Sequence, residues 1–247
     1  MRPYSFFFPL FISSWLCFSS AAIAESEPVR VLFVGNSYTG QIKNTVQRLV
    51  SASPNSDAKL EFINPGGRNL QQHLDNPDTV ARIQEGGWDF VVLQDQSQTP
   101  AVFPDQFASA AKALDKIIDD ADAQTVFYLT WGRRDGDKRN LKLFPTYQKM
   151  QDALSDAYSK SARRADAKLA PVGEVWRAVR EADEELGRAL YKNDGSHPSA
   201  KGAYLAACVF YATLFDADPA DVPYVGDLSK TEAELIRKLT LKVVALP

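Results

Sequence analysis

Short apolar runs alternate with helical patterns along most of the chain. Runs of β-branched, aromatic and aliphatic residues predict five strands, at residues 29–34, 59–63, 89–93, 125–130 and 168–172. The segments between them have the spacing of helices, which is the signature of βαβ units with a parallel sheet. The pattern therefore predicts an α/β fold, a three-layer α/β/α flavodoxin-like sandwich around a five-stranded parallel sheet.

The predicted helices differ in composition. Residues 105–121 and 144–165 carry apolar side chains at helical spacing, and residues 229–246 begin with a plausible capping box. The helix at 199–215 is rich in small residues, which allow close packing on the sheet. The helix that starts at Leu70 is polar, and we expect its His73 to face solvent.

Residues 1–24 depart from the composition of the rest. Arg2 precedes an apolar centre, and Ala22 to Ala24 have the small-x-small form of a cleavage site. We interpret residues 1–24 as a signal peptide, which predicts a secreted or periplasmic protein. A retained membrane anchor is the alternative, but serines interrupt the apolar stretch, which is short for a membrane span.

The remaining residues, 25–247, predict one domain. The whole chain has 28 basic and 31 acidic residues, and loss of Arg2 with the signal peptide changes its net charge from −3 to −4. A mildly acidic protein lacks the excess of positive charge that is typical of nucleic-acid-binding proteins. Only Cys208 survives cleavage, which excludes an intramolecular disulfide. We expect a monomer with no stable membrane insertion.

The stretch 29–40 places a serine at the end of the first predicted strand. The apolar run stops at Gly35 and a helical pattern follows, so Ser37 lies at the sheet edge where ligands bind in open α/β folds. Gln41 stands where a phosphate-binding P-loop needs its lysine. Thr39 stands where the Gly-x-Ser-x-Gly nucleophile elbow needs its second glycine. Ser37 is thus either a helix cap or a nucleophile of another kind.

A second motif, near the other end of the chain, favours the nucleophile. Asp194 and His197 lie in one short loop, and the chain has only two histidines. A serine hydroxyl becomes a good nucleophile when a base accepts its proton, and a carboxylate that fixes the tautomer of the base helps. Ser37, His197 and Asp194 therefore predict a catalytic triad.

Three stretches, 35–37, 65–70 and 194–198, resemble the SGNH or GDSL family of serine hydrolases. The resemblance covers nearly the whole chain after the signal peptide and implies the same sandwich fold. It implies that Ser37 is the nucleophile and that Asp194 and His197 complete the triad. It also implies an oxyanion hole made by the N–H groups of Ser37 and Gly67 and by an asparagine side chain after the third strand.

Two positions depart from the motifs of that family. Asn36 replaces an aspartate, which keeps the shape of the side chain and removes its charge. The family's Gly-x-Asn-Asp motif is absent after the third strand, where residues 94–98 include three glutamines and no asparagine. A glutamine carboxamide offers the same N–H donor one methylene further out, so we predict Gln94 as the third oxyanion donor, with Gln96 as the fallback.

The loop 131–139 leaves the same edge of the sheet as Ser37 and is the candidate for specificity. Trp131 is predicted to stack on a sugar or an acyl chain, and Arg133 to meet an anionic group. The alternative is a solvated loop of mixed charge with a packed tryptophan. We expect no metal and no cofactor, because His197 lacks the partner histidines of a zinc site.

These observations predict a secreted serine ester hydrolase for short acyl groups such as O-acetyl, carried by a small molecule or a glycan. Two alternatives stay open, an O-acyltransferase with the same site and a non-catalytic carbohydrate-binding module that kept the fold. The missing Gly-x-Asn-Asp motif favours the binding module. The joint presence of a nucleophile, a base and an orienting carboxylate favours catalysis.

Overall fold

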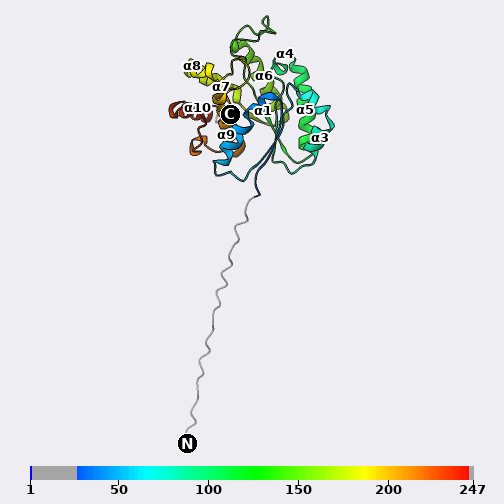
Figure 1. Cartoon of the computed structure of the whole chain (residues 1–247). Coiled ribbons are helices and arrows are strands. Elements are labelled where there is room, and N and C mark those ends of the chain that lie inside the picture. Colours follow the sequence, from blue (N-terminus) through cyan, green and yellow to red (C-terminus); the bar gives the residue numbers. More distant parts are fainter. Residues whose placement is uncertain (2–26, 245–247) are drawn as a thin grey trace.

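A single five-stranded parallel sheet forms the centre of the protein in the computed structural model (Figure 1). The strand order is β2-β1-β3-β4-β5, with β1 at Arg30–Val34, β2 at Lys59–Ile63, β3 at Phe90–Leu93, β4 at Gln124–Tyr128 and β5 at Lys168–Ala170. The structure describes residue 1 and residues 27–244, so the predicted signal peptide lies outside the described residues apart from Met1.

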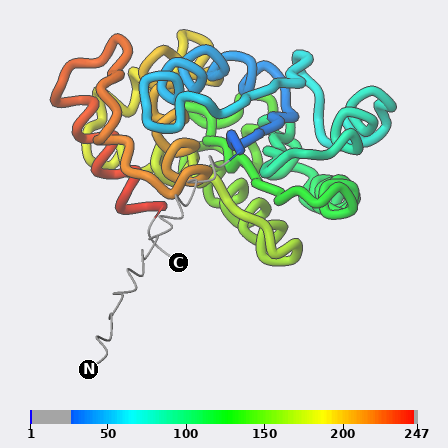
Figure 2. Tube along the Cα trace, turned by 90° about the horizontal axis from the view of Figure 1, so that it is seen from below, coloured from blue at the N-terminus to red at the C-terminus, as the bar shows by residue number. Residues whose placement is uncertain are grey.

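Helices cover both faces of the sheet and make the three layers that the sequence predicts. One face carries α1 (Ser37–Ser51), α7 (Val172–Ala182), α9 (Ala200–Phe215) and α10 (Lys230–Val244). The other carries α2 (Leu70–Leu74), α3 (Pro77–Gln84), α5 (Pro104–Asp119) and α6 (Tyr147–Ala165). Three short helices pack beside them, α4 (Thr99–Val102) against α5 and α6, α8 (Glu184–Ala189) against α7, and the 3-10 helix η1 (Pro219–Asp221) against α9 and α10. Figure 2 shows the last part of the chain gathered on one side, away from α3 and α5.

β1 lies between β2 and β3, and its alternate side chains pack into the two separate cores. Such burial on both faces explains why this strand is a continuous apolar run. The register pairs Val34 with Ile63 of β2 and with Leu93 of β3. The three strands therefore end at the same level, and the loops that follow them start side by side.

Two strands are shorter than the sequence predicts. β4 ends at Tyr128 and not at residue 130, and β5 ends at Ala170 and not at residue 172. Pro171 follows β5 and has no N–H for a sheet ladder. The N–H of Gly173 instead donates to the carbonyl oxygen of Leu129 at 2.9 Å, and an added Cβ at Gly173 would overlap the Thr130 carbonyl.

Two helices also begin or end where side chains cap them. α6 begins at Tyr147, because the Thr146 hydroxyl accepts from the backbone N–H of Lys149. The polar helix that starts at Leu70 ends after five residues, and Asn76 then caps α3. Local polar side chains therefore set these boundaries.

The apolar helix α9 is almost wholly buried, and it packs against both α1 and α10. This contact joins the first helix of the chain to a helix near its end, as the adjacent labels in Figure 1 show. Within residues 27–244, no helix combines the length and the hydropathy that crossing a membrane requires.

Candidate active site

Ser37 is the first residue of α1, directly after the turn at Gly35 and Asn36. Asn36 caps this helix, since its Oδ1 accepts from the N–H of Tyr38 at 3.1 Å. Its Nδ2 donates to the carbonyl oxygen of Arg68 at 2.8 Å, a bond that an ionised aspartate could not make. Asn36 therefore joins the turn after β1 to the loop after β2.

Two hydrogen-bond distances join the three side chains that the sequence predicts as a triad, with His197 in the middle. Ser37 Oγ is 3.0 Å from His197 Nε2, and His197 Nδ1 is 2.6 Å from Asp194 Oδ2. When Nδ1–H donates to the carboxylate, Nε2 accepts the hydrogen of the serine hydroxyl. The arrangement has the nucleophile, base and carboxylate geometry of a triad.

Asp194 is oriented by its own loop. Its Oδ1 accepts from the backbone N–H of Ser196 at 2.9 Å and from that of His197 at 3.0 Å. Burial alone would raise the pKa of Asp194, but the hydrogen bonds from the His197 ring and from these two N–H groups hold that pKa below its ordinary value. The carboxylate therefore stays charged beside His197 at neutral pH.

A stack of aromatic rings supports the loop 194–197. The hydroxyls of Tyr38 and Ser196 share a hydrogen bond of 2.7 Å, and Trp131 Nε1 donates to the carbonyl oxygen of Ser196 at 2.9 Å. The rings of Tyr38 and Trp131 stack with centroids 4.9 Å apart, and Trp131 stacks on Trp176 at 3.9 Å. Trp131 is fully buried in this stack, so the prediction that it contacts a substrate is wrong.

The prediction that His73 faces solvent is also wrong. His73 is fully buried, and its Nε2 lies 2.8 Å from the carbonyl oxygen of Gly35. Because a carbonyl only accepts, Nε2 carries the proton. Burial lowers the pKa of His73, the bond to Gly35 opposes this, and the charge of Arg68 lowers the pKa further. His73 is therefore a neutral donor that satisfies the backbone just before Ser37.

Comparison with solved structures shows the family of this chain. A protein from Slackia heliotrinireducens, described as an SGNH hydrolase, is 31% identical, with a TM-score of 0.64 over 75% of this chain and 98% of that one. This chain belongs to the SGNH hydrolases. As a member of this family, the protein is a hydrolase of ester substrates. No protein-family model and no curated protein sequence matches the chain.

Two further structures share the fold of this SGNH hydrolase at lower sequence identity. A protein of the DUF4886 family from Bacteroides uniformis has a TM-score of 0.74 at 18% identity, over 89% of this chain and 95% of that one. An acetylxylan esterase from Geobacillus stearothermophilus has a TM-score of 0.58 at 13% identity, over 80% of this chain and 95% of that one.

The first glutamine after β3 supports the turn that carries Ser37 in this SGNH hydrolase. Gln94 is fully buried, and its Oε1 accepts from Asn36 N–H and from Thr39 Oγ1, both at 2.9 Å. Its Nε2 donates to the carbonyl oxygen of Asp95. A Cβ on Gly35 would lie 2.2 Å from Thr39 Oγ1 and 2.6 Å from Gln94 Oε1, so a larger residue there would displace the side chains that hold this turn. The prediction of Gln94 as an oxyanion donor is therefore wrong, because the enclosed carboxamide faces the turn.

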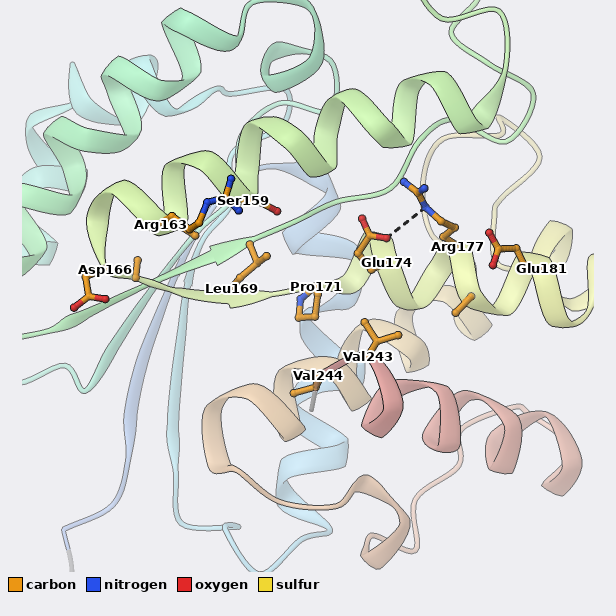
Figure 3. A pocket seen from close by; sticks show the side chains of 13 residues that line it. Ser159, Arg163, Asp166, Leu169, Pro171, Glu174, Arg177, Glu181, Val243 and Val244 are labelled. Atoms are coloured by element: carbon orange, nitrogen blue, oxygen red, sulfur yellow. Dashed lines mark ion pairs between the residues drawn. The ribbon is translucent and has the colours of Figure 1, made fainter. Parts of the chain in front are cut away.

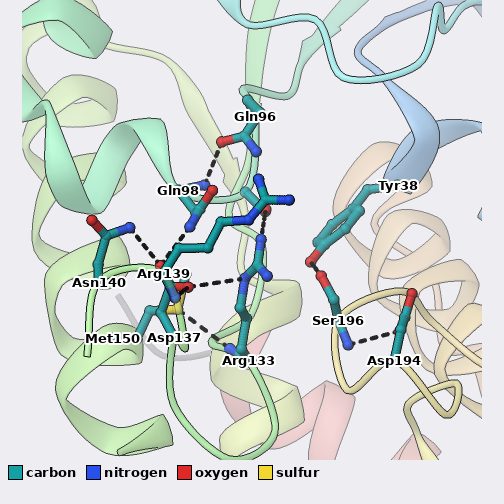
Figure 4. A network of polar contacts seen from close by, with 11 residues as sticks. Tyr38, Gln96, Gln98, Arg133, Asp137, Arg139, Asn140, Met150, Asp194 and Ser196 are labelled. Atoms are coloured by element: carbon teal, nitrogen blue, oxygen red, sulfur yellow. Dashed lines mark hydrogen bonds and ion pairs between the residues drawn. The ribbon is translucent and has the colours of Figure 1, made fainter. Parts of the chain in front are cut away.

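The fallback, Gln96, is placed differently. It is half-buried, and its Oε1 accepts from the N–H of Gln98 at 2.7 Å. No hydrogen bond engages its Nε2 among the described residues, and Figure 4 shows this nitrogen on the side that faces Tyr38. Gly67, the other predicted donor, is exposed at φ 73° in the loop that Asn36 joins to the turn after β1.

Asp95 is a buried carboxyl group behind Gln96. Its Oδ1 accepts from the N–H of Gln96 at 2.5 Å, and its own N–H donates to Tyr158 at 3.1 Å. Burial raises the pKa of Asp95 to about 7, although hydrogen bonds from the N–H groups of Gln96 and Leu70 and from the Thr99 hydroxyl lower it. Asp95 thus connects the loop after β3 to the start of α2.

A cavity of about 790 Å³ lies elsewhere, at the edge strand β5 between α6, α7 and the end of α10 (Figure 3). No histidine lines it, and its Glu174 and Arg177 pair with each other at 3.3 Å. Ser37, Asp194 and His197 are not among the residues that line it, so this cavity is separate from the candidate site. In the described part of the chain, no three His, Cys, Asp or Glu side chains converge as a metal site.

The charge of Asp95 should make stability depend on pH. Its carboxyl has a pKa near 3.8 when unfolded and about 7 when folded, so the folded protein binds this proton more tightly. The difference in the free energy of unfolding between the wild-type protein and Asp95→Asn should change with pH. As pH rises from about 4 to 7, the wild-type protein should lose up to about 1.4 kcal/mol for each pH unit relative to the variant, and above about pH 7 the difference should stay level. Urea unfolding of both proteins at pH 5, 6, 7 and 8 measures the difference, and a constant difference would contradict the expectation.

Proposed function

We propose that this SGNH hydrolase is a secreted serine esterase in which Ser37 attacks an acyl carbonyl. The hydrogen-bonded chain from Ser37 through His197 to Asp194, with distances of 3.0 and 2.6 Å, carries the proposal. His197 takes the proton of Ser37 and gives it to the leaving alcohol, while the Asp194 carboxylate stabilises the imidazolium. Water then attacks the acyl-enzyme by the same route and releases the acid.

The negative charge that develops on the carbonyl oxygen needs hydrogen-bond donors. The N–H of Ser37 has no partner within its helix, because Ser37 is the first residue of α1. Gly67 N–H and Gln96 Nε2 come from the two neighbouring loops, which begin at the level where β1 ends. These three groups make the proposed oxyanion hole.

The proposed substrate is a short acyl ester, such as an O-acetyl group on a carbohydrate. Two observations support this choice. Proteins that share the fold include acetylxylan esterases, and residues 1–24 have the pattern of a signal peptide, which would bring the enzyme to glycans outside the cytoplasm. The triad distances favour catalysis over a carbohydrate-binding module, since binding alone needs no activated serine.

The mature protein that starts at Glu25 should hydrolyse p-nitrophenyl acetate and butyrate. Ser37→Ala and His197→Ala should each lower kcat by about 10⁴- to 10⁶-fold, because each removes a member of a unit that acts together. Release of p-nitrophenol measures the rates, and circular dichroism checks that the variants fold. A folded wild-type protein that hydrolyses no ester faster than these variants would favour the transferase or the binding module.

Gln96→Ala should lower kcat for p-nitrophenyl acetate by about 10²- to 10³-fold with little change in KM, because the oxyanion forms only as the reaction proceeds. Gln98→Ala is a matched control from the same loop, since it removes a carboxamide but keeps the N–H that orients Gln96. We expect less than about a tenfold effect of the control. Equal losses in the two variants would exclude a specific role of Gln96.

A further inference from the structure

A basic loop between β4 and α6 lies beside the triad. Arg134 N–H donates to the carbonyl oxygen of Gly195 at 2.9 Å, so this loop contacts the loop that carries Asp194 and His197. Arg133 Nη2 lies 3.4 Å from Ser97 Oγ, in the loop that carries Gln96. Arg133 thus lies between the loop that carries Asp194 and His197 and the loop that carries Gln96.

The charge of Arg133 also acts on Tyr38, the residue that follows the nucleophile. Burial raises the pKa of the Tyr38 hydroxyl, whereas hydrogen bonds from Ser196 and Ser97 and the positive charge of Arg133 lower it. The Tyr38 ring in turn lies 5.2 Å from the His197 ring, measured between centroids. A guanidinium group therefore lies within electrostatic range of the residues that surround the reacting bond.

This guanidinium group is poorly neutralised by the protein itself. Its nearest acid, Asp137, is 3.8 Å from Nε, and Nε is buried with no hydrogen-bond partner. The carboxylate of Asp137 is already occupied by Gln98 Nε2 at 2.6 Å, by Asn140 Nδ2 at 2.8 Å and by the N–H of Arg139 at 3.1 Å. Asp137 thus shapes the loop and leaves hydrogen-bond donors of Arg133 unused.

A second guanidinium group lies in the same loop. Arg139 is exposed, and no acid of the described residues lies within ion-pair distance of it. Figure 4 shows the guanidinium groups of Arg133 and Arg139 extending from the side of Asp137 toward Gln96. Arg134 differs from both, because it pairs with Asp135 at 2.9 Å. Near Gln96, the loop therefore presents one guanidinium group that is only weakly paired, on Arg133, and one without an acid partner among the described residues, on Arg139, and the net charge of the protein is negative.

We propose that Arg133 and Arg139 bind a carboxylate of the substrate, so that this enzyme prefers esters with a negative charge near the scissile bond. The planar fork of a guanidinium group matches a carboxylate, and a partly desolvated pair is stronger than one in open water. This inference rests on the proposed esterase function and narrows its substrate class. The carboxylate belongs either to the acyl group or to the alcohol.

Two matched pairs of esters distinguish these sources. For the acyl side, the pair is p-nitrophenyl butyrate and mono-p-nitrophenyl succinate. For the alcohol side, it is an O-acetylated methyl galactoside and the corresponding methyl galacturonoside. In at least one pair, the carboxylate ester should have a kcat/KM about 10- to 100-fold higher than its neutral partner.

Variants assign that preference to the two arginines. Arg133→Gln and Arg139→Gln together should bring the ratio of charged to neutral kcat/KM close to one, whereas Arg133→Lys should keep part of it. Lys138→Gln removes an exposed charge from the same loop and should leave the ratio unchanged. A wild-type ratio of one or less in both pairs, or a preference that survives the double substitution, would overturn the inference.

Failure of the inference differs from failure of the esterase function in the same assay. Hydrolysis of the neutral esters that disappears in Ser37→Ala, without a preference for carboxylates, would keep the esterase function and reject this inference. Hydrolysis that persists in Ser37→Ala, or no hydrolysis of any of the four esters, would reject both.

Discussion

The turn after β1 depends on the hydrogen bonding of its own buried backbone. A buried N–H or carbonyl group without a partner would cost about 1–3 kcal/mol, and this turn has one group of each kind just before Ser37. Gln94 Oε1 accepts from Asn36 N–H, and His73 Nε2–H donates to Gly35 C=O. Two buried polar side chains from different elements thus fix the backbone that carries Ser37.

The second half of the site is brought to Ser37 by packing in the other core. α1 and α9 are in extensive contact, and the loop that holds Asp194 and His197 lies just before α9. Ser196 links the two halves directly, because its hydroxyl bonds Tyr38 and its carbonyl accepts from Trp131. The aromatic stack thus limits how far His197 can move from Ser37, and this keeps the two side chains within hydrogen-bond distance.

The fold, and the three side chains that the structure brings together at the candidate site, could be predicted because their signals are local. Strand runs, helix caps and the Asp194 and His197 spacing are each visible within a few residues, and a resemblance to a family placed Ser37 with them. The roles of Gln94, Trp131 and His73 could not be predicted in this way. Their side chains contact partners that are distant in sequence, such as Asn36, Tyr38 and Gly35. In addition, successive side chains at the end of a strand point in opposite directions, so an error of one residue in the predicted strand end reverses the direction that is expected for a side chain.

The most direct test of the account is covalent labelling of the protein, expressed as residues 25–247, with a fluorophosphonate, followed by mass spectrometry of the peptides. The account predicts one adduct, on Ser37, no labelling of Ser37→Ala, and labelling of His197→Ala that is slower by at least about 10³-fold, because the hydroxyl then lacks its base. An adduct on another serine, or equal labelling rates with and without His197, would contradict the claim that His197 activates Ser37.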